Sequence, residues 1–140
     1  MLGESGKSRL KRDLAKHEGI KKTVYQCSMG KMTIGVGRNL EDNGLSNEEI
    51  EFMLMNDIDR IEKEVRHVIP NIDEHSETRQ IVLMNMAFNM GTVGLLRFKQ
   101  TLKAFNNKDY PKAAEEMLDS RWARQVGKRA EELSDMMEAG

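Results

Sequence analysis

The most informative part of the chain is HEGIKKTVYQCSMGKMTIGVGRNL, residues 17–40, which holds its only cysteine. Two runs rich in β-branched and aromatic residues, KKTVYQ at 21–26 and MTIGVG at 32–37, flank the short glycine-containing segment CSMGK. This pattern predicts a β-hairpin. Glycines at positions 35 and 37 alternate with apolar residues, which indicates a bend or a close backbone approach rather than a long flat strand.

Helical patterns surround this hairpin on both sides. Residues 8–18 predict a helix that ends at Gly19. A second helix begins at Ser46, which forms a capping box with Glu49, and its apolar residues keep helical spacing until Pro70. Further helices are predicted over residues 76–90, which are apolar nearly all round in their second half, and over 95–105, 110–118 and 128–137. The expected fold class is therefore α+β, with one small β-hairpin unit in an otherwise helical protein.

Chain length and amino-acid composition limit the classes of protein to which this chain can belong. A chain of 140 residues suits one domain with a real core, and no repeat or linker divides it. One cysteine and three scattered histidines give neither a disulfide framework nor a structural zinc site, so we expect no metal and no cofactor. With no leader or long apolar run, we expect a protein made in the cytoplasm, and we expect a monomer.

Charge and one short motif exclude further classes. Residues 1–40 hold nine Lys or Arg against three Asp or Glu, which favours an anionic partner, although a solvated basic helix face explains the same count. Near-neutral overall charge argues against a dedicated nucleic-acid binder. GESGKS at residues 3–8 resembles the end of a phosphate-binding loop, but Met1 stands where that loop needs its first glycine. A nucleotide site is therefore not expected.

Glu18, Cys27 and Thr33 form the strongest set of candidate catalytic residues. A carboxylate at the C-terminal end of a helix faces the negative pole of the helix dipole, which raises its pKa and suits a general acid. The side chains of Cys27 and Thr33 leave opposite strands of the predicted hairpin, so both can point to one place. Taken singly, a solvated glutamate and a small buried cysteine explain the same residues, and spacing alone leaves these alternatives open.

Three separated motifs resemble the phage-type lysozymes of the T4 lysozyme family, glycoside hydrolase family 24. The signature of that family is Glu, eight residues, Asp or Cys, five residues, Thr, and Glu18, Cys27 and Thr33 match it at that spacing. NMAFNMGTVGLLRF at 85–98 resembles the family's central helix and following turn, and SRWARQVGKRA at 120–130 resembles its late Ser-Arg-Trp segment.

The resemblance implies a single lysozyme domain over residues 1–140. Its parts would be a small β lobe at 19–45, a connecting helix at 46–69, and a helical lobe made of 1–18 and 70–140. The implied activity is an endolysin muramidase that hydrolyses the β-1,4 bond between N-acetylmuramic acid and N-acetylglucosamine without a cofactor.

The resemblance also implies roles for single residues. Glu18 would protonate the leaving oxygen, while Cys27 and Thr33 would stabilise the oxocarbenium ion, orient the water or, for Cys27, attack directly. Arg129 matches the arginine that pairs with the catalytic glutamate. The residues implied to line the sugar groove are Phe88, Asn89, Thr101 and Leu40; for Phe88 a place in the core is an equal alternative. Trp122 is expected to be structural.

Two positions depart from the family pattern. Arg38 replaces a histidine, so a salt bridge built on that histidine is not expected, although Arg38 could pair with an acidic residue of the helix from Ser46. Glu116 replaces an asparagine, so that sugar contact is not transferred.

Two other functions remain open at this level. One is a wall-binding protein of the same fold without catalysis, and the other is a cysteine peptidase of wall peptides that pairs Cys27 with His17, His67 or His75. For the lysozyme, the expected partners are bacterial peptidoglycan and a separate pore-forming holin. It would be made in the host cytoplasm and act on the wall in the periplasm, as a bacteriolytic, antimicrobial enzyme of phage host-cell lysis.

Overall fold

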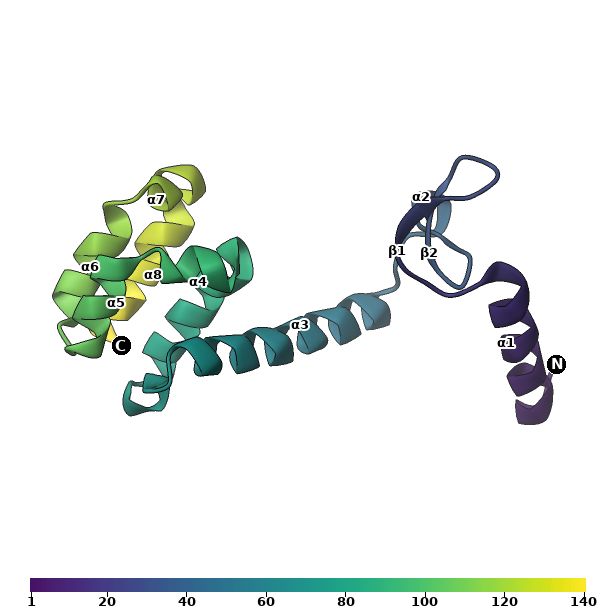
Figure 1. Ribbon diagram of the computed structural model, residues 1–140, viewed down its shortest axis with the longest axis horizontal. Helices are drawn as coiled ribbons and strands as arrows, with labels where there is room; N and C mark the ends of the chain where they lie inside the picture. Colours follow the sequence, from purple (N-terminus) through teal and green to yellow (C-terminus); the bar gives the residue numbers. More distant parts are fainter. The chain divides into compact units, whose positions relative to one another are not determined.

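The computed structural model describes residues 1–140 and opens with helix α1 (Glu4–Glu18), which starts four residues before the predicted residue 8. Gly19 ends α1 with a positive φ of 75°, and its N–H donates to the carbonyl of Ala15. None of the side chains of α1 is buried. The predicted stop of this helix is confirmed (Figure 1).

A three-stranded antiparallel sheet follows α1 in the order β1-β2-β3. Its strands are β1 (Lys21–Gln26), β2 (Met32–Gly35) and β3 (Arg38–Asn39), and Tyr25 pairs with Thr33 across the first two. The predicted hairpin is confirmed, but the MTIGVG run does not stay one strand. Gly35 and Gly37 adopt φ of 69° and 66°, and this bend starts β3, which the sequence did not reveal.

Two helices follow the sheet. The short α2 (Leu40–Asn43) is capped by Asn39, whose side-chain oxygen accepts from the backbone N–H of Asp42. The long α3 (Asn47–Val68) has the predicted capping box, because Ser46 and Glu49 exchange backbone-to-side-chain hydrogen bonds of 2.9 and 3.1 Å. Both bounds of α3 fall within the predicted connecting helix at 46–69.

Five further α-helices and one 3-10 turn complete the chain, with bounds η1 (Ile72–Glu74), α4 (Glu77–Leu96), α5 (Lys99–Asn106), α6 (Tyr110–Leu118), α7 (Arg121–Val126) and α8 (Lys128–Ala139). The predicted helix end at residue 90 is confirmed, because Gly91, with φ of 80°, is not helical and separates α4 into two helical parts. The predicted helix from residue 95 begins instead at Lys99. Helix α7 was not predicted, although Ser120 caps its start and Gly127 ends it.

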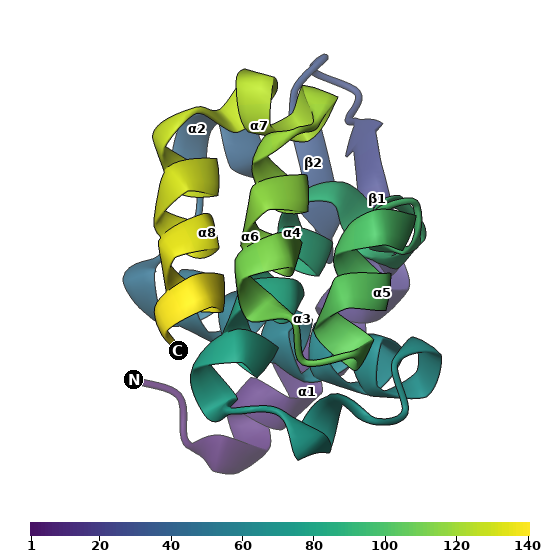
Figure 2. The same cartoon turned by 90° about the vertical axis from the view of Figure 1, so that its left-hand side faces the viewer.

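The core lies among α4, α6 and α8. Helix α6 packs against both α5 and α8, which flank it in Figure 2. The largest fully buried side chains of the core include three methionines, Met86, Met117 and Met137, together with Leu83 and Phe105. Methionine side chains are unbranched and flexible, so these three residues fill gaps in the core.

The chain divides into two compact units, Met1–Phe52 and Met53–Gly140. Residues 19–45, the predicted small lobe, lie wholly in the first unit, and residues 70–140 lie wholly in the second. Assigning residues 1–18 to the helical lobe concerns the packing of the two units and stays a prediction. No single helix is long and apolar enough to span a membrane; α4 and α5 reach that length and hydropathy only as a pair bent by 98°.

Candidate functional site

Glu18 is the last residue of α1, and its side chain lies against the turn between β2 and β3. A Cβ atom added at Gly37 would stand 3.0 Å from the Oε2 atom of Glu18 and 3.1 Å from its carboxyl carbon. Only a glycine fits there, since φ is also positive at this position. The turn residue Gly37 therefore leaves room for an exposed carboxylate at the end of α1.

Cys27 and Thr33 come together at the end of the hairpin. The N–H of Cys27 donates to the carbonyl of Lys31 at 2.9 Å, and the hydroxyl of Thr33 donates to the same carbonyl at 2.8 Å. Thr33 is buried, with 2% of its surface exposed, whereas the free thiol of Cys27 is half-buried. The hairpin register thus brings the backbone N–H of Cys27 and the side-chain hydroxyl of Thr33 to the same carbonyl.

The environment of Cys27 favours its thiolate. Backbone hydrogen bonds from Lys31 and then Met29 lower the pKa of the thiol below its ordinary value, and the hydroxyl of Thr33 lowers it further. A thiolate is the nucleophilic form of cysteine. None of these hydrogen-bond partners is an imidazole, so the thiol is activated by the turn itself.

Arg38 pairs with the first turn of α3, as the sequence allowed. Its Nη1 atom lies 2.9 Å from Oε1 of Glu49 and 3.2 Å from the carbonyl oxygen of Gly44. Arg38 lowers the pKa of Glu49 to about 2, with help from the N–H and hydroxyl of Ser46. The pair ties β3 to the start of α3. Half-buried Leu40, one of the predicted groove residues, opens α2 between these two anchors.

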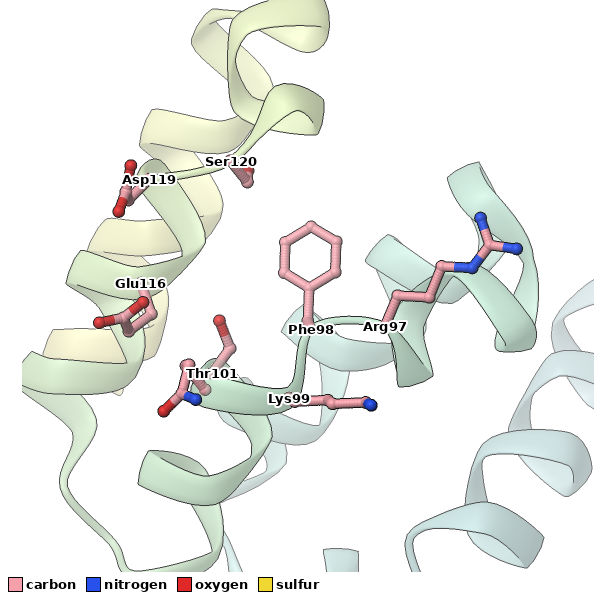
Figure 3. Close-up of a pocket in the computed structure, with 8 residues that line it drawn as sticks. Arg97, Phe98, Lys99, Thr101, Glu116, Asp119 and Ser120 are labelled. Carbon is pink, nitrogen blue, oxygen red and sulfur yellow. The ribbon is translucent and has the colours of Figure 1, made fainter.

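A pocket of about 520 Å³, whose lining residues are mostly of polar or charged type, lies in the second unit between the α4–α5 junction and the end of α6 (Figure 3). We call it the Thr101 pocket; its lining residues are Arg97, Phe98, Lys99, Gln100, Thr101, Glu116, Asp119 and Ser120. Thr101, a predicted groove residue, is 1% exposed and lines this pocket. The pocket thus combines a predicted groove residue with Glu116, the position where the sequence departs from the family pattern.

A second, largely apolar pocket of about 790 Å³ lies beside α4 and is lined by Leu54, Ile58, Ile61, Ile81, Met84, Asn85, Phe88 and Arg129. Phe88 is 46% exposed, so in this unit it does not occupy the core, which was one of its two predicted alternatives. Arg129 donates to Oδ1 of Asn85 from Nε at 3.0 Å and from Nη2 at 2.7 Å. These bonds fix the guanidinium and leave Nη1 available. The predicted pairing of Arg129 with Glu18 joins the two units and stays a prediction.

Asn89 has a structural partner that the sequence did not reveal. Its Oδ1 atom accepts a 2.7 Å hydrogen bond from the indole Nε1 of Trp122, whose ring also meets Phe98 edge to face. Trp122 is buried, in keeping with its predicted structural role. The role of Asn85 as the partner of Arg129 was not predicted, although a signal existed: Asn85 and Asn89 are the two amides that interrupt the apolar run IVLMNMAFNM. No three His, Cys, Asp or Glu side chains lie close enough together to hold a metal ion.

Comparison with known proteins supports the resemblance to phage lysozymes. The family model for phage lysozyme matches residues 15–138. Two proteins of Dictyostelium discoideum, named probable T4-type lysozyme 2 and probable T4-type lysozyme 1, are 27% and 26% identical to this chain. The alignments cover 95% and 92% of this chain and 95% and 94% of those relatives. The pre-baseplate central spike protein Gp5 of Enterobacteria phage T4 is 26% identical over 91% of this chain, which corresponds to 27% of the spike protein.

Proposed function

The chain belongs to the phage lysozyme family, and from that membership we propose that it is a muramidase that hydrolyses the β-1,4 bond between N-acetylmuramic acid and N-acetylglucosamine in peptidoglycan. One observation carries the proposal: Glu18 stands at the end of α1 against Gly37, and Cys27 and Thr33 meet at the hairpin end of the same unit. Glycoside hydrolysis needs an acid for the leaving oxygen and a second group that attacks the sugar or activates water; in this proposal Glu18 is the acid and Cys27 with Thr33 takes the second part.

In the proposed reaction, Glu18 gives its proton to the glycosidic oxygen while the bond from that oxygen to the anomeric carbon breaks. The anomeric carbon then carries oxocarbenium character. The thiolate of Cys27 stands on the other face of the sugar, where it either bonds to the anomeric carbon or takes the proton of a water held with Thr33. The first route passes through a thioglycosyl intermediate that water cleaves, and it retains the anomeric configuration. The second inverts it.

The sugar chain is proposed to run over Leu40, Phe88, Asn89 and Thr101. Three facts support this choice: Leu40 is half-buried at the start of α2, Phe88 exposes nearly half of its surface beside a pocket, and Thr101 lines a pocket. Exposed aromatic faces and free hydroxyls are the groups that bind sugars in water.

Arg129 is proposed to support the acid by pairing with Glu18. Asn85 occupies Nε and Nη2 of Arg129, so the remaining Nη1 is free for a carboxylate.

Release of reducing ends from purified peptidoglycan tests the proposal. The Glu18→Gln protein is expected to lose activity by at least about a hundredfold, the range of general acid catalysis. Asp13→Asn, which removes an exposed carboxylate from the same helix, is the matched control and should keep the activity of the parent. A folded Glu18→Gln protein as active as the parent would sink the mechanism.

The anomer of the first product separates the two routes of Cys27. If the thiol attacks directly, NMR shows the retained anomer first, and Cys27→Ser gives little product. If the thiol only positions water, the inverted anomer appears first. Mass analysis of the fragments excludes the cysteine peptidase, because glycan and peptide cleavage release different products.

Access to the substrate is also part of the proposal. The family resemblance supports an endolysin that is made in the host cytoplasm and meets peptidoglycan in the periplasm once a separate holin has opened the inner membrane. Expression in a bacterium with and without a holin tests this: lysis should need both proteins, and lysis by this chain alone would contradict the route.

A further inference from the structure

The side chain of Glu18 lies along a turn made of glycines. A Cβ atom added at Gly37 would stand 3.0 Å from Oε2 of Glu18, 3.1 Å from its carboxyl carbon and 3.2 Å from its Cγ. Gly35 and Gly37 both have positive φ, and glycine has the most mobile backbone of all residues when nothing else restrains it. Such a turn stays beside Glu18 only if other contacts hold its end.

Arg38 holds the end of this turn. It follows Gly37 in the chain and pairs with Ile34 of β2, but β3 is only two residues long, so its ladder supplies few bonds. A single side-chain atom of Arg38, Nη1, donates to the carbonyl of Gly44 at 3.2 Å and to Oε1 of Glu49 at 2.9 Å. The turn is thereby tied to the loop before α3 and to the first turn of α3.

The partner of Arg38 is itself fixed in place. Oε1 of Glu49 also accepts from the N–H of Ser46 at 2.9 Å, and the N–H of Glu49 donates to the hydroxyl of Ser46 at 3.1 Å. The side chains of Arg38 and Glu49 are 41% and 39% exposed. Exposed ion pairs are commonly weak because two long side chains must be ordered to form them, but here the capping box already orders Glu49.

We propose that Arg38 is a positioning residue for the general acid: it acts through Gly37 and keeps the carboxylate of Glu18 where it can protonate the leaving oxygen. The inference rests on the proposed function and adds one residue to its mechanism. An acid must lie within hydrogen-bond reach of the oxygen that it protonates, and a displacement of about 1 Å can lower a rate by about a hundredfold. The groove residue Leu40 keeps its own helix cap from Asn39, so the effect falls on kcat rather than on KM.

Steady-state kinetics on soluble peptidoglycan fragments test the proposal. Arg38→Met keeps an unbranched stem and removes both bonds, so kcat should fall by about tenfold or more while KM stays within about twofold of the parent. Arg38→Lys should recover most of the activity, because one nitrogen makes both bonds in the parent and the ammonium of lysine is one nitrogen with three donors. Arg60→Met, which breaks two exposed ion pairs on α3, is the matched control and should keep the kcat of the parent.

Gly37→Ala tests the path from Arg38 to Glu18. The added methyl group displaces the carboxylate directly, so kcat should fall here too. If both changes act through one contact, Gly37→Ala combined with Arg38→Met loses little more kcat than the more affected single variant, whereas independent effects multiply. Arg38→Gln, a second neutral variant, should behave as Arg38→Met does, and urea unfolding shows that each assayed protein is folded.

Three results would overturn the inference. The first is a folded Arg38→Met or Arg38→Gln protein with the kcat of the parent. The second is a loss that lies wholly in KM, and the third is a pair of losses that multiply in the double variant with Gly37→Ala.

NMR of the carboxyl carbon of Glu18 separates this inference from the proposed function, because it requires no cleavage. The resonance should move in Arg38→Met and return toward its parent position in Arg38→Lys. If it does so in a protein that does not cleave peptidoglycan, the proposed function fails and the positioning of Glu18 by Arg38 stands. If the parent cleaves peptidoglycan, Glu18→Gln does not, and Arg38→Met keeps the kcat of the parent, the inference fails alone.

Discussion

The hydrogen bond between Trp122 and Asn89 yields a prediction that separates a structural role from a substrate role. Asn89→Ala removes the acceptor at 2.7 Å and leaves the indole N–H of a residue that is only 7% exposed without a partner. An unpaired buried donor costs about 1–3 kcal/mol. Because Asn89 itself is exposed, water can replace part of the bond, and we expect a loss of about 1–2 kcal/mol. In a chain of this length that lowers the melting temperature by roughly 3–8 °C.

A double-mutant cycle measures the bond itself. Trp122→Phe removes the indole donor while keeping an aromatic ring that can meet Phe98 edge to face, at the present 5.8 Å between ring centroids. In that background Asn89→Ala has no bond to break, so its cost in free energy of unfolding should fall close to zero. Urea unfolding of the four proteins gives the coupling energy, which we expect to be about 1 kcal/mol.

The same four proteins test whether Asn89 also contacts the sugar. If its amide N–H₂ group binds substrate, Asn89→Ala raises KM for soluble peptidoglycan in the Trp122→Phe background as well, where stability no longer changes. The structural reasoning is refuted if Asn89→Ala leaves the melting temperature of the parent unchanged, or if it costs as much in the Trp122→Phe background as in the parent.

Three further predictions follow from other contacts. The stability that the Arg38–Glu49 pair contributes is present above the ordinary pKa of Glu49 and is lost as the pH falls toward about 2, so Glu49→Gln should flatten the acid end of a plot of urea midpoint against pH. Burial, and then Lys108, lower the pKa of His75. The neutral ring therefore stabilises the fold above pH 6.5, and this contribution declines as the pH falls below that value. His75→Phe should reduce the slope of melting temperature against pH in that range. Arg79 donates to two carbonyls at the end of α8, at 2.7 and 2.9 Å, and stacks on the ring of Tyr110. Arg79→Ala should therefore lower the free energy of unfolding in urea by about 2–3 kcal/mol. The same change at exposed Arg124 is the control and should cost under about 0.5 kcal/mol.

Local chemistry explains which elements could be predicted. The hairpin, the capping box at Ser46 and the stop at Gly19 depend on contacts between residues a few positions apart, and all three are confirmed. The short elements α2, β3 and α7 were missed, because four, two and six residues carry too little periodic signal. The predicted helix end at residue 90 falls next to the non-helical Gly91, where the two parts of α4 meet.

The sequence by itself indicated the family, which the comparisons confirm. It also predicted the candidate set Glu18, Cys27 and Thr33, because these residues lie within sixteen positions on one helix end and one hairpin. Only the tertiary structure decided the partners of the second unit. Asn85 and Arg129 are 44 residues apart in the sequence, and Asn89 and Trp122 are 33 apart. The type of each residue does not indicate which distant residue it contacts. The physical reason is that a hairpin register follows from the chain itself, whereas the meeting of distant helices depends on how apolar faces pack together.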